Sequence, residues 1–583
     1  MILPASLSIP PARWGFPLVL ISLLTGPALG LLTEAQRTDI SDFVSALVEC
    51  RNVSGLALGI VFGDGNNEDD VFTAGFGYSD RERNLNVTNS TQFALGSLST
   101  TFTTTLVSKL LHGNKNKYPD GWDTTVKEVL GRDFKLSDPL RTEYTTLRDL
   151  AAHKTGYPHY QSLMGGLSHS VKRSEYCSRY FLLKPKYEFR GDFHFSKEMF
   201  TLLGCVAEVL GGGTSLEELV TSYLFNPLQM TSSSFVNATD NLAVPHVYNN
   251  GSFLPLDSSL LRAIYPNEAA EGVVSTAEDM VKWLHYHLLH VANMSQIQEG
   301  QVLEQTYLPQ VQYKLSKMTE FEPQSRVKQV VFAHNLGWES GQYRSYRFIQ
   351  QSGKLSGFTS KVVVFRDISL GIFISMNSGS SKIDTMTTDI ITWHISDLLL
   401  IQRPPLFFSP ENACMHEYPF AHEGILVPGP MFSQPRRPTA SIPTRTTTTT
   451  PAPKQPQWET AYLGTYGHQT FGNITISYDS MEDALTYKTG VVGSGMLQNA
   501  GKEDMFLLKF RGPLSYMHKM FPDKNITFYF EKIQDGQFTA LQVQEDQLEY
   551  QRSVRWDLPN SVQSLTQRVG IMFTLLVLQV SLF

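Results

Sequence analysis

The stretch Gln92-Phe-Ala-Leu-Gly-Ser97-Leu-Ser-Thr100 decides how the rest of the chain is interpreted. A short apolar run ends at Gly96 and Ser97, and the Thr- and Leu-rich residues 101–111 predict a buried helix. A serine at the head of a helix can point its hydroxyl into a cleft. Its backbone N–H lies near the helix N-terminus, where developing negative charge is stabilised. The stretch therefore predicts a nucleophile position at Ser97.

Seven segments, in family order, resemble the serine β-lactamase-related family that includes class C β-lactamases and penicillin-binding proteins. The segment around Ser97 is the first, and residues 146–158, which contain His153-Lys-Thr-Gly156, are similar to the family's "LLTHTSGLP" loop. The other five lie at residues 195–204, 225–231, 271–279, 351–358 and 370–377. The resemblance implies an α/β fold, an α+β sandwich of the β-lactamase/transpeptidase type, over residues 31–403.

The residues that move protons in this family differ at the matching positions. Serine β-lactamases require Ser-x-x-Lys, because the lysine one helical turn on shares a face with the serine and removes its proton. Thr100 occupies the lysine position, and Phe195 occupies the position of the family's tyrosine. A threonine hydroxyl is no base near neutral pH, and a phenyl ring carries no proton. Without acid–base catalysis, which is worth roughly 10²–10⁴-fold in rate, Ser97 should be an unreactive alcohol.

Two further motif positions also differ. Lys197 replaces the motif asparagine, and in the third motif, Gln351-Ser352-Gly353, Gln351 replaces a cationic or imidazole residue. The glycines and apolar residues that shape the cleft in the family are present. The sequence therefore predicts a scaffold that is kept without its chemistry.

Five basic side chains are candidates for a replacement base: His153, Lys154, His194, Lys197 and Lys354. His153 matches a family position that we expect to be structural. His194 lies between Phe193 and Phe195, so in an extended segment it would face away from the aligned catalytic position. Lys197 is the best rival, because its position borders the cleft and a buried lysine can lose its proton.

Composition excludes several classes of function. The 583 residues, 42% hydrophobic and 18% charged, predict a globular protein of two or three domains. A formal net charge of −7 without a basic cluster gives no reason to expect nucleic-acid binding. There is no P-loop, no GxGxxG after a strand, and no HExxH or paired CxxC, so we expect neither a metal nor a cofactor.

Both ends of the chain predict the secretory pathway. Residues 1–30 contain the short apolar run Phe16–Leu24 and the small-x-small site Ala28-Leu-Gly30, as a signal peptide does. Residues 557–583 end in a hydrophobic run with small residues and a polar spacer upstream, which fits a glycolipid-anchor signal better than a short membrane helix. Sequons, the acceptor sites for N-glycosylation, occur at Asn52, Asn86, Asn89, Asn237, Asn250, Asn293, Asn473 and Asn525.

A second domain is predicted after a linker. Residues 404–457 hold a Thr/Pro run that cannot bury a core and is typical of an O-glycosylated stalk. Residues 458–556 alternate apolar and polar residues in short runs, which predicts a small antiparallel β-sandwich or barrel. The four cysteines allow three pairings. The family resemblance favours Cys50–Cys414 and Cys177–Cys205.

The sequence thus predicts a secreted or cell-surface glycoprotein that binds an unidentified extracellular ligand or protein through a domain without hydrolase activity. Two alternatives remain open. One is an active serine hydrolase, an esterase or peptidase acylated at Ser97 with a non-standard base. The other is a structural matrix or adhesion protein in which the cleft has no role.

Overall fold

The computed structural model describes residues 32–552 except 64–66, 161–171, 237–240, 250, 294–297, 314–328, 380–381, 401–412, 415–458, 469, 517–525 and 545–547. The signal-peptide prediction, the anchor prediction and three sequons (Asn237, Asn250 and Asn525) lie outside these residues, as does the linker apart from residues 413–414. No helix in the described ranges is both long and apolar enough to span a bilayer.

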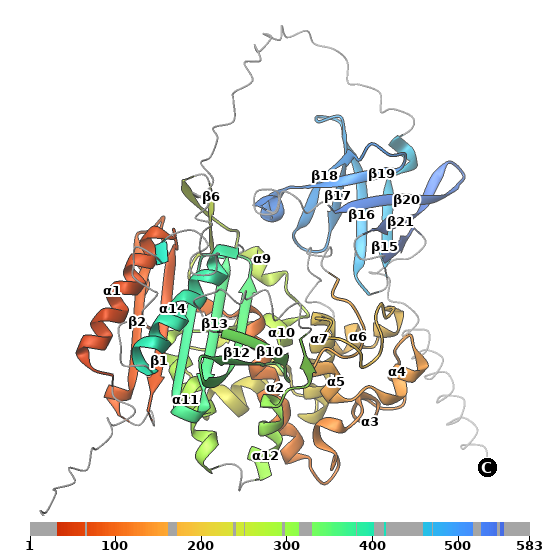
Figure 1. Cartoon of the computed structure of the whole chain (residues 1–583). Helices are drawn as coiled ribbons and strands as arrows, with labels where there is room; N and C mark the ends of the chain where they lie inside the picture. The colour runs from red at the N-terminus through yellow and green to blue at the C-terminus, as the bar shows by residue number, and fades with distance from the viewer. Residues whose placement is uncertain are drawn as a thin grey trace, which may run out of the picture.

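The first domain is built on a nine-stranded antiparallel sheet (Figure 1). In sheet order its strands are β3 (Leu85–Asn86), β2 (Val71–Asp80), β1 (Gly55–Phe62), β14 (Leu370–Met376), β13 (Phe358–Phe365), β12 (Tyr346–Leu355), β11 (Glu339–Tyr343), β10 (Gln329–His334) and β9 (Val311–Gln312). The central strands β1, β13 and β14 are buried along their whole length, which their nearly unbroken apolar sequences allow. The N-terminal strand β1 pairs with the late strand β14, so both ends of the domain contribute to its centre.

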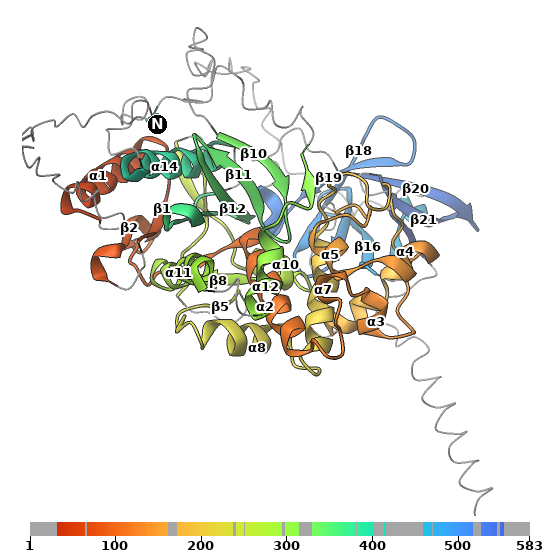
Figure 2. The same cartoon turned by 60° about the horizontal axis from the view of Figure 1, so that its bottom comes forward.

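Two helices cover one face of this sheet, and α11 (Ala277–Asn293) packs against its other face (Figure 2). The first two are α1 (Glu34–Cys50), which Thr33 begins with a capping box, and α14 (Lys382–Leu400). The remaining helices lie beneath α11's side of the sheet or form a helical part beside it: α2 (Ser99–Gly113), α3 (Val126–Leu130), α4 (Pro139–Tyr144), α5 (Leu147–Ala151), α6 (Arg173–Cys177), α7 (Lys197–Leu210), α8 (Leu216–Val220), α9 (Ser259–Arg262), α10 (Glu268–Glu271) and α12 (Gln298–Glu304). Two small sheets, β4 (Phe93–Ala94) with β8 (Val273–Ser275) and β5 (Ser234–Phe235), and β6 (His246–Asn249) with β7 (Ser252–Pro255), complete the domain.

The second domain is a closed antiparallel barrel. Its strands are β15 (Gly464–His468), β16 (Gly472–Asp479), β17 (Ala484–Thr489), β18 (Gly493–Asn499), β19 (Met505–Phe510), β20 (Thr527–Gln534), β21 (Gln537–Val543) and β22 (Leu548–Gln551). Alternate residues of most strands are buried, as a closed sheet around one core requires. The α/β fold class with a small antiparallel β-domain is confirmed.

The turn between β15 and β16 contacts the first domain. The Phe471 ring lies 5.1 Å from the Tyr160 ring, and the Thr470 hydroxyl donates to the Arg179 carbonyl at 3.4 Å. The two disulfides join Cys50 to Cys414 and Cys177 to Cys205, the pairs that the resemblance favoured. Disulfides persist in oxidising compartments, so they indicate a secretory or extracellular setting.

Candidate functional site

The turn that carries Ser97 is fixed directly against the edge of β12. Ser97 lies in a 3-10 turn, Gly96–Leu98, that leads into α2, and its side chain is half-buried. Gly96 has a φ of +56°, and a Cβ atom there would lie 2.7 Å from the Lys354 backbone nitrogen. A Cβ atom on Gly353 would lie 1.8 Å from the Leu95 carbonyl. The two glycines therefore permit a close approach that no larger residue would allow.

At the lysine position, Thr100 forms a complete set of neutral hydrogen bonds. Its hydroxyl lies 2.8 Å from the Ser97 carbonyl and 3.1 Å from the Gly337 carbonyl, either of which can accept its proton. It accepts from Gln351 Nε2 at 2.9 Å. Gln351 Oε1 accepts in turn from the Ser352 backbone N–H at 3.1 Å. The first and third motifs are thus joined by a hydroxyl and an amide, neither of which can take a proton from Ser97.

No hydrogen bond to the Ser97 hydroxyl is found among the residues that the structure describes. Neither an amine nor an imidazole therefore forms a hydrogen bond with it in that part of the chain. Since a general base must lie within hydrogen-bond reach of the proton that it abstracts, none of the described residues is a ready base for Ser97.

His153 holds the segment that carries Phe195. Its buried ring accepts from the Ser196 backbone N–H at 3.1 Å through Nδ1 and lies 4.9 Å from the Phe195 ring and 5.2 Å from the His334 ring. Burial, with smaller contributions from His334 and His159, lowers the pKa of His153 well below its ordinary value. So weak a base accepts a proton poorly near neutral pH, and the position is occupied by a structural histidine.

Lys197, the best rival base, is held by an ion pair. It begins α7, and its Nζ lies 2.5 Å from Glu271 Oε2 on α10. The Lys197 side chain is 23% exposed and that of Glu271 only 4%. A paired ammonium offers only donors, so in this arrangement Lys197 cannot accept the serine proton.

The remaining candidate bases are His194, Lys354 and Lys154. The His194 ring stacks on Tyr187, with ring centroids 3.5 Å apart. Burial lowers the pKa of Lys354, while the carboxylates of Asp384 and Asp389 oppose the shift. The Lys154 backbone N–H donates to the Asp149 carbonyl, which fixes the main chain of the loop after α5. None of the three forms a hydrogen bond to Ser97 among the described residues.

Sequence reasoning missed a carboxylate–imidazole pair beside Phe195. Glu198 is buried in the first turn of α7 and accepts from Ser196 Oγ at 3.0 Å and from the Tyr160 N–H at 3.2 Å. His159 Nδ1 lies 3.3 Å from both carboxylate oxygens, and its ring meets the Phe195 ring edge-on at 5.7 Å. Burial raises the pKa of Glu198, but His159 and the hydrogen bonds together outweigh it and hold that pKa below its usual value. No pattern in the sequence indicates that His159 and Glu198, which are 39 positions apart, would form a pair.

No cofactor site is apparent in these surroundings. Nowhere in the described residues do three or more His, Cys, Asp or Glu side chains gather in a way that could hold a metal ion.

Comparison with known proteins identifies the family. The profile of the family "Beta-lactamase" matches residues 42–391, well over half of the chain. The chain belongs to this family. Its relatives include "Unguisins hydrolase ungD'" of Aspergillus campestris, which is 23% identical over 77% of this chain and 79% of the relative. Gigasin-6 of Magallana gigas is 29% identical over 39% of this chain and 74% of its own length. "Beta-lactamase" of Escherichia coli is 26% identical over 47% and 68% respectively.

A solved structure of similar length was also found. The octameric penicillin-binding protein homologue from Pyrococcus abyssi is 17% identical, with a TM-score of 0.49, and the match covers 86% of this chain and 97% of that one. The family assignment rests on the sequence profile, and the site's chemistry has to be argued from the residues that this chain carries.

Proposed function

We propose that the chain is an extracellular glycoprotein whose β-lactamase-like domain has lost serine hydrolase activity and acts by binding. The observation that supports this most directly is the Thr100 hydroxyl, which lies at the lysine position and contacts two carbonyls and the Gln351 amide. Positioned acid–base catalysis is worth roughly 10²–10⁴-fold, and this site offers Ser97 no partner for it.

Covalent labelling tests the proposal. The full-length protein is incubated with a fluorophosphonate probe and, separately, with a fluorescent penicillin, alongside the Ser97→Ala variant. We expect no label that depends on Ser97. Labelling that Ser97→Ala abolishes would overturn the proposal. The E. coli β-lactamase to which this chain is similar serves as the positive control for the penicillin.

The His159–Glu198 pair favours one competing function, an active serine hydrolase with a non-standard base. A buried carboxylate that orients an imidazole is the arrangement that activates nucleophiles in other hydrolases. This candidate predicts Ser97-dependent labelling that His159→Gln also abolishes. If labelling is lost in Ser97→Ala and persists in His159→Gln, the base is another group.

The location is part of the same proposal. Two disulfides support a secretory route. We propose in addition that sequons are glycosylated and that the C-terminal segment attaches the protein to the cell surface. Treatment of intact cells with a phosphatidylinositol-specific phospholipase should release the protein, and N-glycosidase should lower its apparent mass. Retention on the cells after phospholipase treatment would refute the glycolipid anchor.

A further inference from the structure

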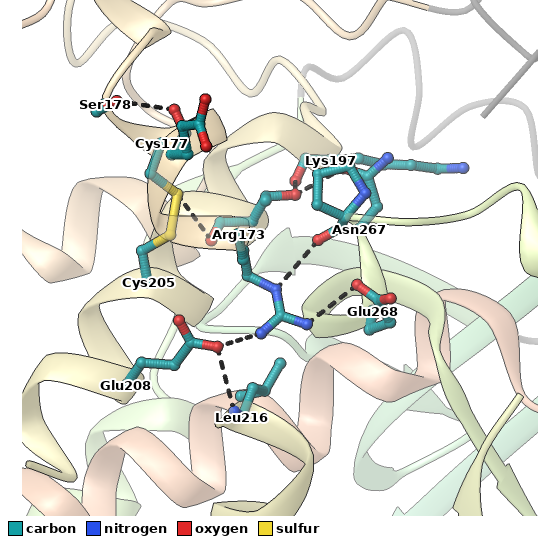
Figure 3. The surroundings of a disulfide bond; sticks show 12 residues. Arg173, Cys177, Ser178, Lys197, Cys205, Glu208, Leu216, Asn267 and Glu268 are labelled. Atoms are coloured by element: carbon teal, nitrogen blue, oxygen red, sulfur yellow. Dashed lines mark hydrogen bonds and ion pairs between the residues drawn. A yellow bond between two sulfur atoms is a disulfide. The ribbon is translucent and has the colours of Figure 1, made fainter. Parts of the chain in front are cut away.

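A buried arginine joins four helices beside the Cys177–Cys205 disulfide (Figure 3). Arg173 of α6, whose side chain is 4% exposed, contacts Glu208 of α7, Glu217 of α8 at 2.5 Å and Glu268 of α10 at 3.1 Å. Its Nε donates to the Pro266 carbonyl at 3.3 Å. We name Arg173 with these three glutamates the Arg173 cluster. One cation faces three carboxylates, so the cluster has an excess of two negative charges when all three are ionised.

The Arg173 cluster is connected to the candidate site through α10. Glu268, at the start of this single turn, contacts Arg173, and Glu271, at its end, pairs with Lys197. The Thr103 hydroxyl of α2 donates to the Ala269 carbonyl at 2.6 Å. A displacement of α10 would therefore move both the partner of Lys197 and a contact of the helix that follows Ser97.

Charge and burial make the Arg173 cluster a place where a proton can bind. Burial raises the pKa of both Glu208 and Glu268, and Arg173 offsets only part of this effect because three carboxylates share it. Tyr176 and Tyr265 lie beside the Arg173 cluster, and burial raises the pKa of each, so both remain neutral.

Other charged groups nearby are already paired. At the outer end of α6, Arg179 pairs with Glu175, and at the start of α7, Lys197 pairs with Glu271. Because Arg179 and Lys197 are bound to other carboxylates, they do not neutralise the excess negative charge of the Arg173 cluster. A proton can reduce that charge.

We propose that the Arg173 cluster is a proton-binding site that positions α10, so that acidification tightens α10 against Arg173 and fixes the Lys197–Glu271 pair at the candidate site. Protonation of Glu208, which belongs to α7, removes repulsion between carboxylates and leaves Glu217 and Glu268 to bind the guanidinium, so α10 keeps its ion pair with Arg173. A carboxyl whose pKa is raised on folding binds its proton more tightly in the folded state, so its contribution to stability grows as the pH falls. The inference does not depend on whether Ser97 is reactive.

Hydrogen exchange of the full-length protein, read by mass spectrometry, tests this inference. The amides of Ala270 and Glu271 donate to the Asn267 carbonyl, and that of Gly272 donates to the Glu268 carbonyl, so they report on the opening of α10. After correction for intrinsic exchange, these amides should exchange more slowly at about pH 5.5 than at about pH 7.5. The difference should grow as the pH falls, and it should approach roughly tenfold for each unit by which the pKa is raised only at or below the ordinary carboxyl pKa of 4.5. Glu208→Gln, which imitates the protonated state and leaves the Arg173–Glu268 pair in place, should exchange slowly at both pH values.

Controls separate this mechanism from a general effect of acid. Glu175→Gln removes a carboxylate of α6 outside the Arg173 cluster and should keep the wild-type pH response. Glu217→Gln, on α8, provides a second variant should Glu208→Gln fold poorly, and it should also weaken the response. Exchange at α10 that is equal or faster at acidic pH in the wild type would overturn the inference, as would an unchanged pH response in both glutamine variants. Labelling of Ser97 decides the proposed function separately.

Discussion

Acid should destabilise the β-lactamase domain through His334, a buried neutral imidazole. His334 ends β10, and burial lowers its pKa from 6.5 to about 4, although a hydrogen bond to the Ala151 backbone opposes the shift. A histidine whose pKa falls on folding does not lower the free energy of unfolding at pH values above its unfolded pKa. It lowers this free energy progressively as the pH falls from 6.5 towards 4. At about pH 5 the unfolded imidazole is largely protonated and the folded one largely neutral, which costs about 2 kcal/mol of folding free energy.

The assay is urea unfolding at about pH 7.5 and about pH 5, followed by tryptophan fluorescence. The fluorescence reports on this domain because its four tryptophans, Trp122, Trp283, Trp338 and Trp393, are fully buried. The loss of unfolding free energy on acidification should be smaller by about 2 kcal/mol in His334→Gln than in the wild type. His285→Gln, at a half-buried histidine of α11, is the matched control and should keep the wild-type loss. An equal loss in His334→Gln and the wild type would show that His334 is not held neutral and would refute the reasoning.

Other perturbations have clear expected outcomes. Thr100→Val should lower the free energy of unfolding by about 0.5–1.5 kcal/mol, because it removes the acceptor of the half-buried Gln351 amide. Ser97→Ala should change it by less than about 0.5 kcal/mol. Both free energies are measured by urea unfolding. Replacing Cys50 and Cys414 by serine should cost about 2–5 kcal/mol, measured by the same method, because the bridge closes a loop of 364 residues. Phe471→Ala should weaken docking of the barrel by about 0.5–1.5 kcal/mol and increase the radius of gyration in small-angle scattering, and an unchanged radius would contradict this.

The sequence predicted those parts of the structure that depend on local pattern. Alternating runs after residue 458 predicted a sandwich or a barrel, and the structure has a closed barrel. The sequence of the middle region also predicts helices over residues 200–210, 216–223 and 277–290. The last corresponds to α11, and the first to α7, which begins earlier, at Lys197. Residues 216–223 form α8 followed by a π-helical turn, Thr221–Phe225. Helix and strand periodicity depends on residues that are close together in the chain, so it can be recognised in a single sequence.

The choice of partners for charged residues could not be predicted. Arg173 meets glutamates 35, 44 and 95 residues further along the chain, and His159 meets Glu198 across a separation of 39. The sequence marks Lys197 as a candidate base but says nothing of Glu271, the residue that binds it. Ion pairs of this kind are set by tertiary packing, and nothing in the flanking residues specifies them.

The residues at two of the substituted motif positions, Thr100 and Gln351, fit one another. A lysine at position 100 would offer only donors, and Gln351 Nε2 would then lack the acceptor that Thr100 Oγ1 provides. Thr100 and Gln351 together instead form a neutral network in which each polar group has a partner, and such networks hold a site in one shape. An unpaired polar group in a protein interior costs folding free energy whatever the site does, so the fit between Thr100 and Gln351 is explained by the stability of the fold.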